Sequence, residues 1–276
     1  MHLKFFVAKL IGRVLNLIAY FNPGLSSKWA LDLFSTPLKG RFKSANPIIE
    51  TAKKSILQFQ NMAIATYHWK GMNQTILLAH GWQSNSGRWK NLINVLKSNE
   101  YNIVCIDAPA HGASSGKKFN AVLYSKFIKV ACEKYNPSIL IGHSVGCMAI
   151  SYFLKTSHYK KVEKLVFLGA PSAFSGILKN YNDLMGYNKR LRDGIELKIQ
   201  DRFSFPSIHF NTSKFIISLE CLGLIIHDEH DPVIPYSDAL EIHSAFKKSH
   251  LLKTKGLGHG LKSKEVIKAI TKFISD

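Results

Sequence analysis

The five-residue run Gly142-His143-Ser144-Val145-Gly146 is the segment of this sequence whose residue types and spacing point most directly to chemistry. It follows the apolar residues 138–141 and precedes a helix-like stretch over residues 147–155. Where a strand turns at once into a helix, glycines two residues to either side of a serine leave room for the bend, and the hydroxyl projects over the end of the sheet. This context, more than the pentapeptide alone, predicts a serine nucleophile.

A serine nucleophile needs a base to take its proton and an acid to orient that base. In an open parallel sheet, such groups meet on loops that follow the carboxyl ends of strands. Residues 227–235 follow a predicted strand and contain Asp228 and Asp231, and residues 256–260 follow the next predicted strand and contain His259. Three separate loops therefore carry a serine, an aspartate and a histidine, in that chain order.

The elements that would position these loops alternate along the chain. Short apolar strands alternating with amphipathic helices predict an α/β fold, with a mostly parallel sheet and helices on both faces. The predicted strands are residues 62–69, 75–79, 103–106, 139–141, 165–168, 222–226 and 250–253. The predicted helices are residues 89–97, 119–135, 147–155, 238–246 and 264–274. Residues 172–215 are too long for a crossover loop, and we expect them to form a small cap insertion.

Residues 60–276 resemble the α/β-hydrolase superfamily, and in particular its esterase, lipase and serine-aminopeptidase-like members. The motifs that carry the resemblance, besides the serine pentapeptide, are His80-Gly81-Trp82, residues 107–112, residues 231–235 and Gly258-His259. The resemblance implies the α/β-hydrolase fold, with Ser144 as nucleophile, Asp231 as acid and His259 as base.

An oxyanion hole needs backbone N–H donors, and one comes from the residue after the nucleophile, Val145. The resemblance implies that the second donor is the amide of Trp82, whose indole would then wall the pocket. The chain departs from the family at Ala110, where glycine is frequent, so we expect a slightly strained backbone there.

Several residues have competing interpretations. Asp228 is the alternative acid because it lies closer to the end of its strand. His243 and His250 are other candidate bases, but they fall in a predicted helix and at a strand start, where we expect structural roles. We expect four further motif residues to orient loops or to support the structure: His80, Asp107, His111 and His143.

Residues 1–50 form a separate N-terminal region in this interpretation. Residues 1–21 are apolar but interrupted by Lys4, Lys9 and Arg13. The longest stretch without a charge, residues 14–21, is too short to span a bilayer, and the position of Arg13 does not match a signal peptide. They predict an amphipathic helix that either lies on a membrane or packs on the domain or on a partner subunit. Residues 22–50 contain three prolines and are expected to form a linker-like arm, followed by a hydrolase domain over 51–276.

The net charge of +19 comes mainly from 31 lysines, which are spread along the chain. This distribution favours a lysine-rich surface, or attraction to an anionic membrane, over nucleic-acid binding. The four cysteines form no C-x-x-C pair, which favours reduced thiols in a cytoplasmic protein over a metal site or disulfides.

These observations predict a serine hydrolase that cleaves carboxylic esters of small-molecule acyl substrates through an acyl-enzyme, with no metal or organic cofactor. The apolar cap favours medium-to-long acyl chains. A thioesterase, an aminopeptidase or a non-catalytic membrane-associated binding module are the alternatives. An aminopeptidase would need acidic residues for the substrate's amine, and the cap offers Asp183, Asp193, Glu196 and Asp201.

Overall fold

The computed structural model describes residues 2–42, 44, 46–157 and 159–276, which form two compact units. Unit 1 comprises residues 1–36 and 173–211, and unit 2 comprises residues 37–172 and 212–276. The sequence predicted a boundary at residue 50 between an N-terminal region and the rest of the chain. The structure instead joins the first 36 residues to the insertion, and residues 37–50 to the sheet-containing unit.

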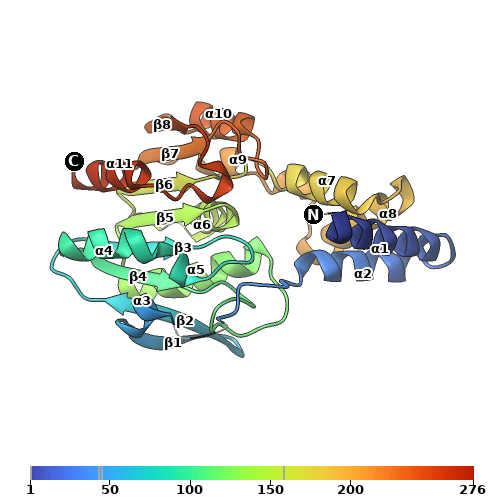
Figure 1. Ribbon diagram of the computed structural model, residues 1–276, viewed down its shortest axis with the longest axis horizontal. Coiled ribbons are helices and arrows are strands. Elements are labelled where there is room, and N and C mark those ends of the chain that lie inside the picture. Colours follow the sequence, from blue (N-terminus) through green and yellow to red (C-terminus); the bar gives the residue numbers. More distant parts are fainter. Residues whose placement is uncertain (1, 43, 45, 158) are drawn as a thin grey trace. The chain divides into compact units, whose positions relative to one another are not determined.

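Unit 2 is built on one eight-stranded sheet with the order β1-β2-β4-β3-β5-β6-β7-β8 (Figure 1). Strands β3 to β8 run parallel to one another, whereas β2 is antiparallel to both β1 and β4. The strands are β1 Lys53–Phe59, β2 Met62–Trp69, β3 Thr75–Ala79, β4 Asn102–Ile106, β5 Ile139–His143, β6 Lys164–Leu168, β7 Leu222–Asp228 and β8 Ser249–Thr254. The predicted mostly parallel sheet is confirmed.

Helices cover both faces of this sheet and bury two separate apolar cores. One face carries α5 Ala121–Tyr135, α6 Val145–Ser157, α9 Thr212–Ile216 and α10 Tyr236–Ala245. The other carries α3 Pro47–Glu50, α4 Lys90–Ser98 and α11 Lys264–Ser275. The central strands are buried on both sides, which explains why they are continuous apolar runs in the sequence.

Unit 1 is a bundle of four helices. They are α1 His2–Phe21, α2 Pro23–Ser35, α7 Phe174–Met185 and α8 Lys189–Phe203, followed by the short turn η2 Ser207–His209. Their shared core is formed by Leu15 and Ala19 of α1, Ala30 of α2, and apolar residues of α7 and α8. The N-terminal helix therefore packs on the insertion, 150 or more residues further along the chain.

One prediction about the N-terminal half was wrong, and one strand there was missed. Residues 22–50 are not a linker-like arm, because α2 and α3 lie within them. Pro23 occupies the first turn of α2, where proline is tolerated, and the side chain of Asn22 caps that helix by accepting from the amide of Leu25. Strand β1 was missed because it is an edge strand with only partial burial.

Candidate active site

Ser144 lies at the sharp turn between β5 and α6, as the glycine spacing predicts. Its φ of +53° falls in the left-handed region, which is strained for a residue with a side chain. Gly146 makes this turn sterically feasible, because a Cβ at that position would lie 2.4 Å from the carbonyl oxygen of Ala79. The strained turn holds the hydroxyl of Ser144 at the carboxyl end of the central strand.

The structure brings Ser144, His259 and Asp231 together. His259, in the short turn η3 Gly258–Gly260, has its Nε2 atom 3.0 Å from Ser144 Oγ and its Nδ1 atom 2.7 Å from Asp231 Oδ2. Because the carboxylate can only accept, Nδ1 carries the proton, and Nε2 is left to accept from the serine hydroxyl. This is the geometry in which a histidine can remove a proton from a serine.

Two loop amides hold Asp231 in place after β7. Its Oδ1 accepts from the amides of Val233 at 2.8 Å and Ile234 at 3.1 Å, which leaves Oδ2 free to face His259. Burial would raise the pKa of Asp231, but these hydrogen bonds and the one from His259 together bring its pKa below the ordinary value. Asp231 is therefore ionised at neutral pH and can stabilise an imidazolium.

Asp228, the alternative acid, serves its own loop instead. Its Oδ2 accepts from the hydroxyl of Thr254 and the amide of Leu257, and its Oδ1 accepts from the amide of His230. The carboxylate thus ties the end of β7 to the end of β8 and to the loop that leads to His259. It supports the two loops that carry the other residues rather than contacting the imidazole.

The other candidate bases lie elsewhere. His243 is on α10, and its Nδ1 atom is 2.8 Å from the hydroxyl of Ser249. His250 is on β8, next to that serine. Among the three histidines that the sequence offered as bases, the described structure brings only His259 to Ser144.

His80 fixes the peptide that precedes Trp82. The amide of Ala108 donates to its Nε2 at 3.0 Å, so the proton is on Nδ1, which donates to the carbonyl of Gly81 at 2.8 Å. In a trans peptide the N–H points away from the carbonyl, so this bond turns the amide of Trp82 to the opposite side. Gly81 itself lies against Ser144, because a Cβ built there would be 3.0 Å from the serine Cβ.

The two expected oxyanion donors differ in their surroundings. Val145 is the first residue of α6, where an N–H group has no acceptor within its own helix. The indole of Trp82 packs against Phe119, with ring centroids 5.2 Å apart, and against His111 at 5.4 Å. The side chain of Trp82 therefore packs in the structure, independently of the role expected for its amide as an oxyanion donor.

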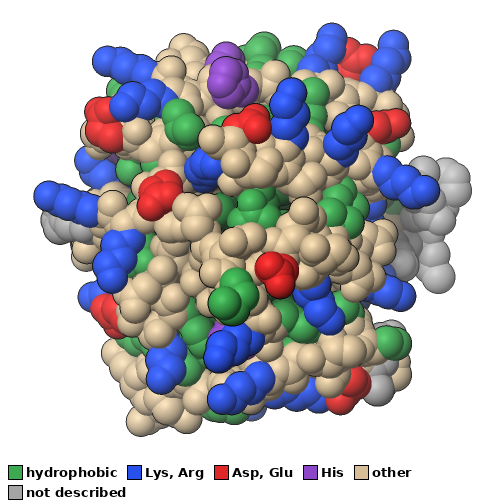
Figure 2. Space-filling model, turned by 90° about the vertical axis from the view of Figure 1, so that its left-hand side faces the viewer, with side chains coloured by type: hydrophobic (Ala, Val, Ile, Leu, Met, Phe, Trp, Pro, Cys, Tyr) green, Lys and Arg blue, Asp and Glu red, His purple; other side chains and the backbone are tan. Residues whose placement is uncertain are grey.

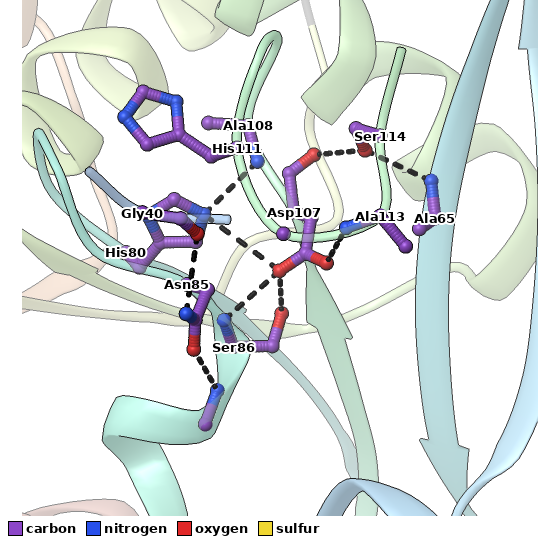
Figure 3. A network of polar contacts seen from close by, with 12 residues as sticks. Gly40, Ala65, His80, Asn85, Ser86, Asp107, Ala108, His111, Ala113 and Ser114 are labelled. Carbon is purple, nitrogen blue, oxygen red and sulfur yellow. Dashed lines mark hydrogen bonds and ion pairs between the residues drawn. The ribbon is translucent and has the colours of Figure 1, made fainter. Parts of the chain in front are cut away.

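Asp107 is the centre of a buried polar network beneath these loops (Figure 3). Its carboxylate accepts from the amide and hydroxyl of Ser86, the amide of Ala113 and the hydroxyl of Tyr67. Burial raises the pKa of Asp107 even though these four bonds oppose the shift. The network ties the segment after β3 to the segment after β4, so the structural role expected for Asp107 agrees with its contacts.

The expectation for Ala110 is confirmed, since its φ is +64°. The amide of Ala110 donates to the carbonyl of Ser115, which closes the loop after β4. Arg41, which sequence reasoning did not single out, clamps the same loop by donating to the carbonyls of Gly112, Ser114 and Gly116. The sequence near residue 41 could not predict this contact, because the acceptors are backbone atoms some 70 residues away.

His143 couples the serine turn to the histidine loop. Its Nε2 donates to the carbonyl of His259 at 2.8 Å, and the two rings lie 4.9 Å apart between centroids. Burial holds the pKa of His143 well below its usual range, so the ring is neutral. Burial likewise lowers the pKa values of His80 and His111 to about 4.

Metal-binding clusters and membrane-spanning helices are both absent from the described residues. No group of histidine, cysteine and acidic side chains there could hold a metal ion, and all four cysteines are free. No described helix is long and apolar enough to cross a membrane. On the face of the molecule in Figure 2, lysine and arginine side chains are scattered among acidic and neutral ones rather than gathered in one patch.

Known protein families match most of unit 2. A family model described as alpha/beta hydrolase fold matches residues 74–205, and one described as TAP-like protein matches residues 221–276. Mouse alpha/beta hydrolase domain-containing protein 10 superposes with a TM-score of 0.67 at 18% identity, covering 82% of this chain and 98% of the mouse chain. The fold and these matches define the class: the chain belongs to the α/β-hydrolase superfamily.

More specific similarities cover shorter stretches. A protein of Mycoplasma pneumoniae that is named as an esterase/lipase is 29% identical over 123 residues, which are 44% of this chain and 45% of the relative. The pimeloyl-[acyl-carrier protein] methyl ester esterase of Wigglesworthia glossinidia brevipalpis is 27% identical over 151 residues, or 54% and 52% of the two chains. The chain thus spans about half the length of these relatives.

Proposed function

We propose that this protein is a serine hydrolase that cleaves carboxylic esters through an acyl-enzyme. The single observation that carries the proposal is His259, which bridges Ser144 at 3.0 Å and Asp231 at 2.7 Å with the proton placed on Nδ1. Relatives named as an esterase/lipase and as a methyl ester esterase support the choice of an ester over other acyl substrates.

In the proposed reaction, Ser144 Oγ attacks the ester carbonyl while His259 Nε2 takes the hydroxyl proton. The amides of Trp82 and Val145 hold the oxygen that becomes negative, and Asp231 stabilises the imidazolium. The carbon–oxygen bond to the alcohol then breaks, and His259 gives its proton to the departing alkoxide. Water, deprotonated by His259, attacks the acyl-serine and releases the carboxylic acid and the free serine.

The acidic residues of the insertion argue against an aminopeptidase. Asp183 pairs with Lys179 and Arg192, and Asp193 pairs with Lys189. Glu196 accepts from the amide of Ser207, and Asp201 lies 3.8 Å from Lys198. Each of the four carboxylates already has a partner, so binding a substrate's ammonium group would require breaking one of these contacts.

Hydrolysis of a p-nitrophenyl ester series from two to sixteen carbons, with fluorophosphonate labelling alongside, tests the proposal. We expect the wild type to label and to turn over, and Ser144→Ala to do neither. Ser151→Ala, a buried serine on the same helix that donates only to the carbonyl of Met148, is the matched control and retains both. A folded wild type that neither labels nor cleaves any ester of the series would refute the proposal in favour of a binding module.

A further inference from the structure

Helix α1 packs on the rest of unit 1 through Leu15 and Ala19 and through small and polar residues beside them. Asn16 donates to the carbonyl of Gly186 at 2.8 Å and accepts from the amide of Asn188 at 2.9 Å. Gly12 lies so close to α7 that a Cβ on it would be 1.8 Å from the carbonyl oxygen of Met185. Lys9 donates to the carbonyl of Asp183 at 2.7 Å, so Lys9 and Asn16 lie on the side of α1 that contacts α7 and the turn after it.

The opposite side of α1 is apolar and exposed along the length of the helix. Leu10 is 49% exposed, Leu17 61% and Phe21 84%. The other large apolar side chains exposed on α1 are Phe5, Phe6, Val7, Ile11, Val14 and Tyr20. At 100° per residue, those from Phe6 onward fall on one continuous face. Soluble proteins rarely leave an apolar surface of this extent uncovered.

The charge around this face is positive. The first acidic residue of the chain is Asp32, whereas Lys9, Arg13 and Lys28 precede it. Arg13 is exposed on the apolar side of α1, and the guanidinium of Arg190 lies 5.7 Å from the ring of Tyr20. An apolar helix face that carries Arg13 and no acidic residue of its own is complementary to an anionic lipid surface.

We propose that α1 lies flat in the headgroup region of an anionic bilayer and inserts its exposed apolar face among the acyl chains. This placement agrees with the composition of the helix, which is not long and apolar enough to cross a membrane. A second copy of the chain is the less favourable occupant. Each copy carries a net charge of +19, and pairing through this face would bring like charges together.

Flotation of the full-length protein with phosphatidylcholine vesicles, with and without 30% phosphatidylglycerol, tests the proposal. We expect flotation with the anionic vesicles at low salt, and weaker flotation with the neutral ones or at about 0.5 M salt, where exposed charges are screened. The variant Leu10→Ser/Leu17→Ser is expected to lose at least tenfold in partition coefficient, because both side chains would leave the acyl region.

Ile56→Ser/Met72→Ser is the matched control, because it removes from unit 2 two apolar side chains that are at least as exposed as Leu10 and Leu17. It should float like the wild type, and equal melting temperatures would show that both variants are folded. The proposal is refuted if the wild type does not float with anionic vesicles, or if the Leu10/Leu17 variant floats unchanged. A wild-type dimer that the Leu10/Leu17 variant converts to monomer, with no lipid binding, would assign the face to a second copy. Ser144→Ala should float normally, so this test is independent of the proposed hydrolysis.

Discussion

Replacing Asp231 by asparagine should reverse the direction of the hydrogen bond on which the proposed chemistry depends. The amides of Val233 and Ile234 donate to Oδ1, so an asparagine would keep its carbonyl oxygen there. Its NH₂ group would then take the place of Oδ2, which lies 2.7 Å from His259 Nδ1. Facing a donor, Nδ1 must accept, and the proton moves to Nε2, where it points at Ser144.

The expected loss follows from this change of tautomer. A histidine protonated on Nε2 cannot take the serine proton, and the imidazolium that forms later also loses its counter-charge. For the equivalent substitution in the well-studied serine protease triad the fall in kcat is about 10⁴-fold, which corresponds to about 5.5 kcal/mol in activation free energy. We expect Asp231→Asn to lower kcat by about 10³ to 10⁴ with little change in melting temperature.

Asp228→Asn is the matched control, because this carboxylate lies three residues away and bonds Thr254, Leu257 and His230 instead of His259. It should lower the melting temperature but leave kcat within about threefold of the wild type. The assay is steady-state hydrolysis of the best p-nitrophenyl ester by both variants. If Asp228→Asn abolishes turnover while Asp231→Asn stays within tenfold of the wild type, the assignment of the acid is wrong.

Two further predictions concern stability. Because burial lowers the pKa values of His80 and His111 to about 4, the unfolded chain binds more protons than the folded one between about pH 6.5 and 4. The free energy of unfolding should therefore be level above pH 6.5 and fall below it, by roughly 3 kcal/mol per histidine at most. Urea titrations at several pH values should show a smaller fall for His111→Gln than for the wild type. Ala110→Gly should raise the unfolding free energy by about 0.5 kcal/mol, because glycine relieves the strain of a φ of +64°; an unchanged or lower value in urea titrations would contradict this reasoning.

The sheet of unit 2 was largely predictable because burial gives its central strands a recognisable apolar sequence. Residues 76–79 and 139–141 are buried on both faces and are therefore unbroken apolar runs. Strand β1 begins with two exposed lysines at the sheet edge, so burial imposes no such pattern on it. Helix α2 was missed because the residues that begin it, Asn22 and Pro23, are also common in loops.

The composition of unit 1 could not be predicted from local patterns. It depends on contacts such as that of Asn16 with Gly186, residues 170 positions apart, and nothing in either segment specifies the other. The sequence did define an amphipathic helix over residues 1–21. It could not show which side faces the bundle, because most of the large apolar residues of this helix point outward. The residues that face the bundle are Gly12, Leu15 and Ala19.

The candidate site was predictable in residue type and loop, but not in how the loops are fixed. His80, His111 and His143 are all buried and neutral, and each one joins two backbone segments through a defined tautomer. Neutrality matters most at His143, whose ring lies 4.9 Å from that of His259. A positive charge there would oppose protonation of His259, which the proposed attack by Ser144 requires. Burial of these three histidines therefore keeps them neutral, so that they hold the loops by hydrogen bonds without placing a competing cation beside the imidazole that becomes charged in the proposed mechanism.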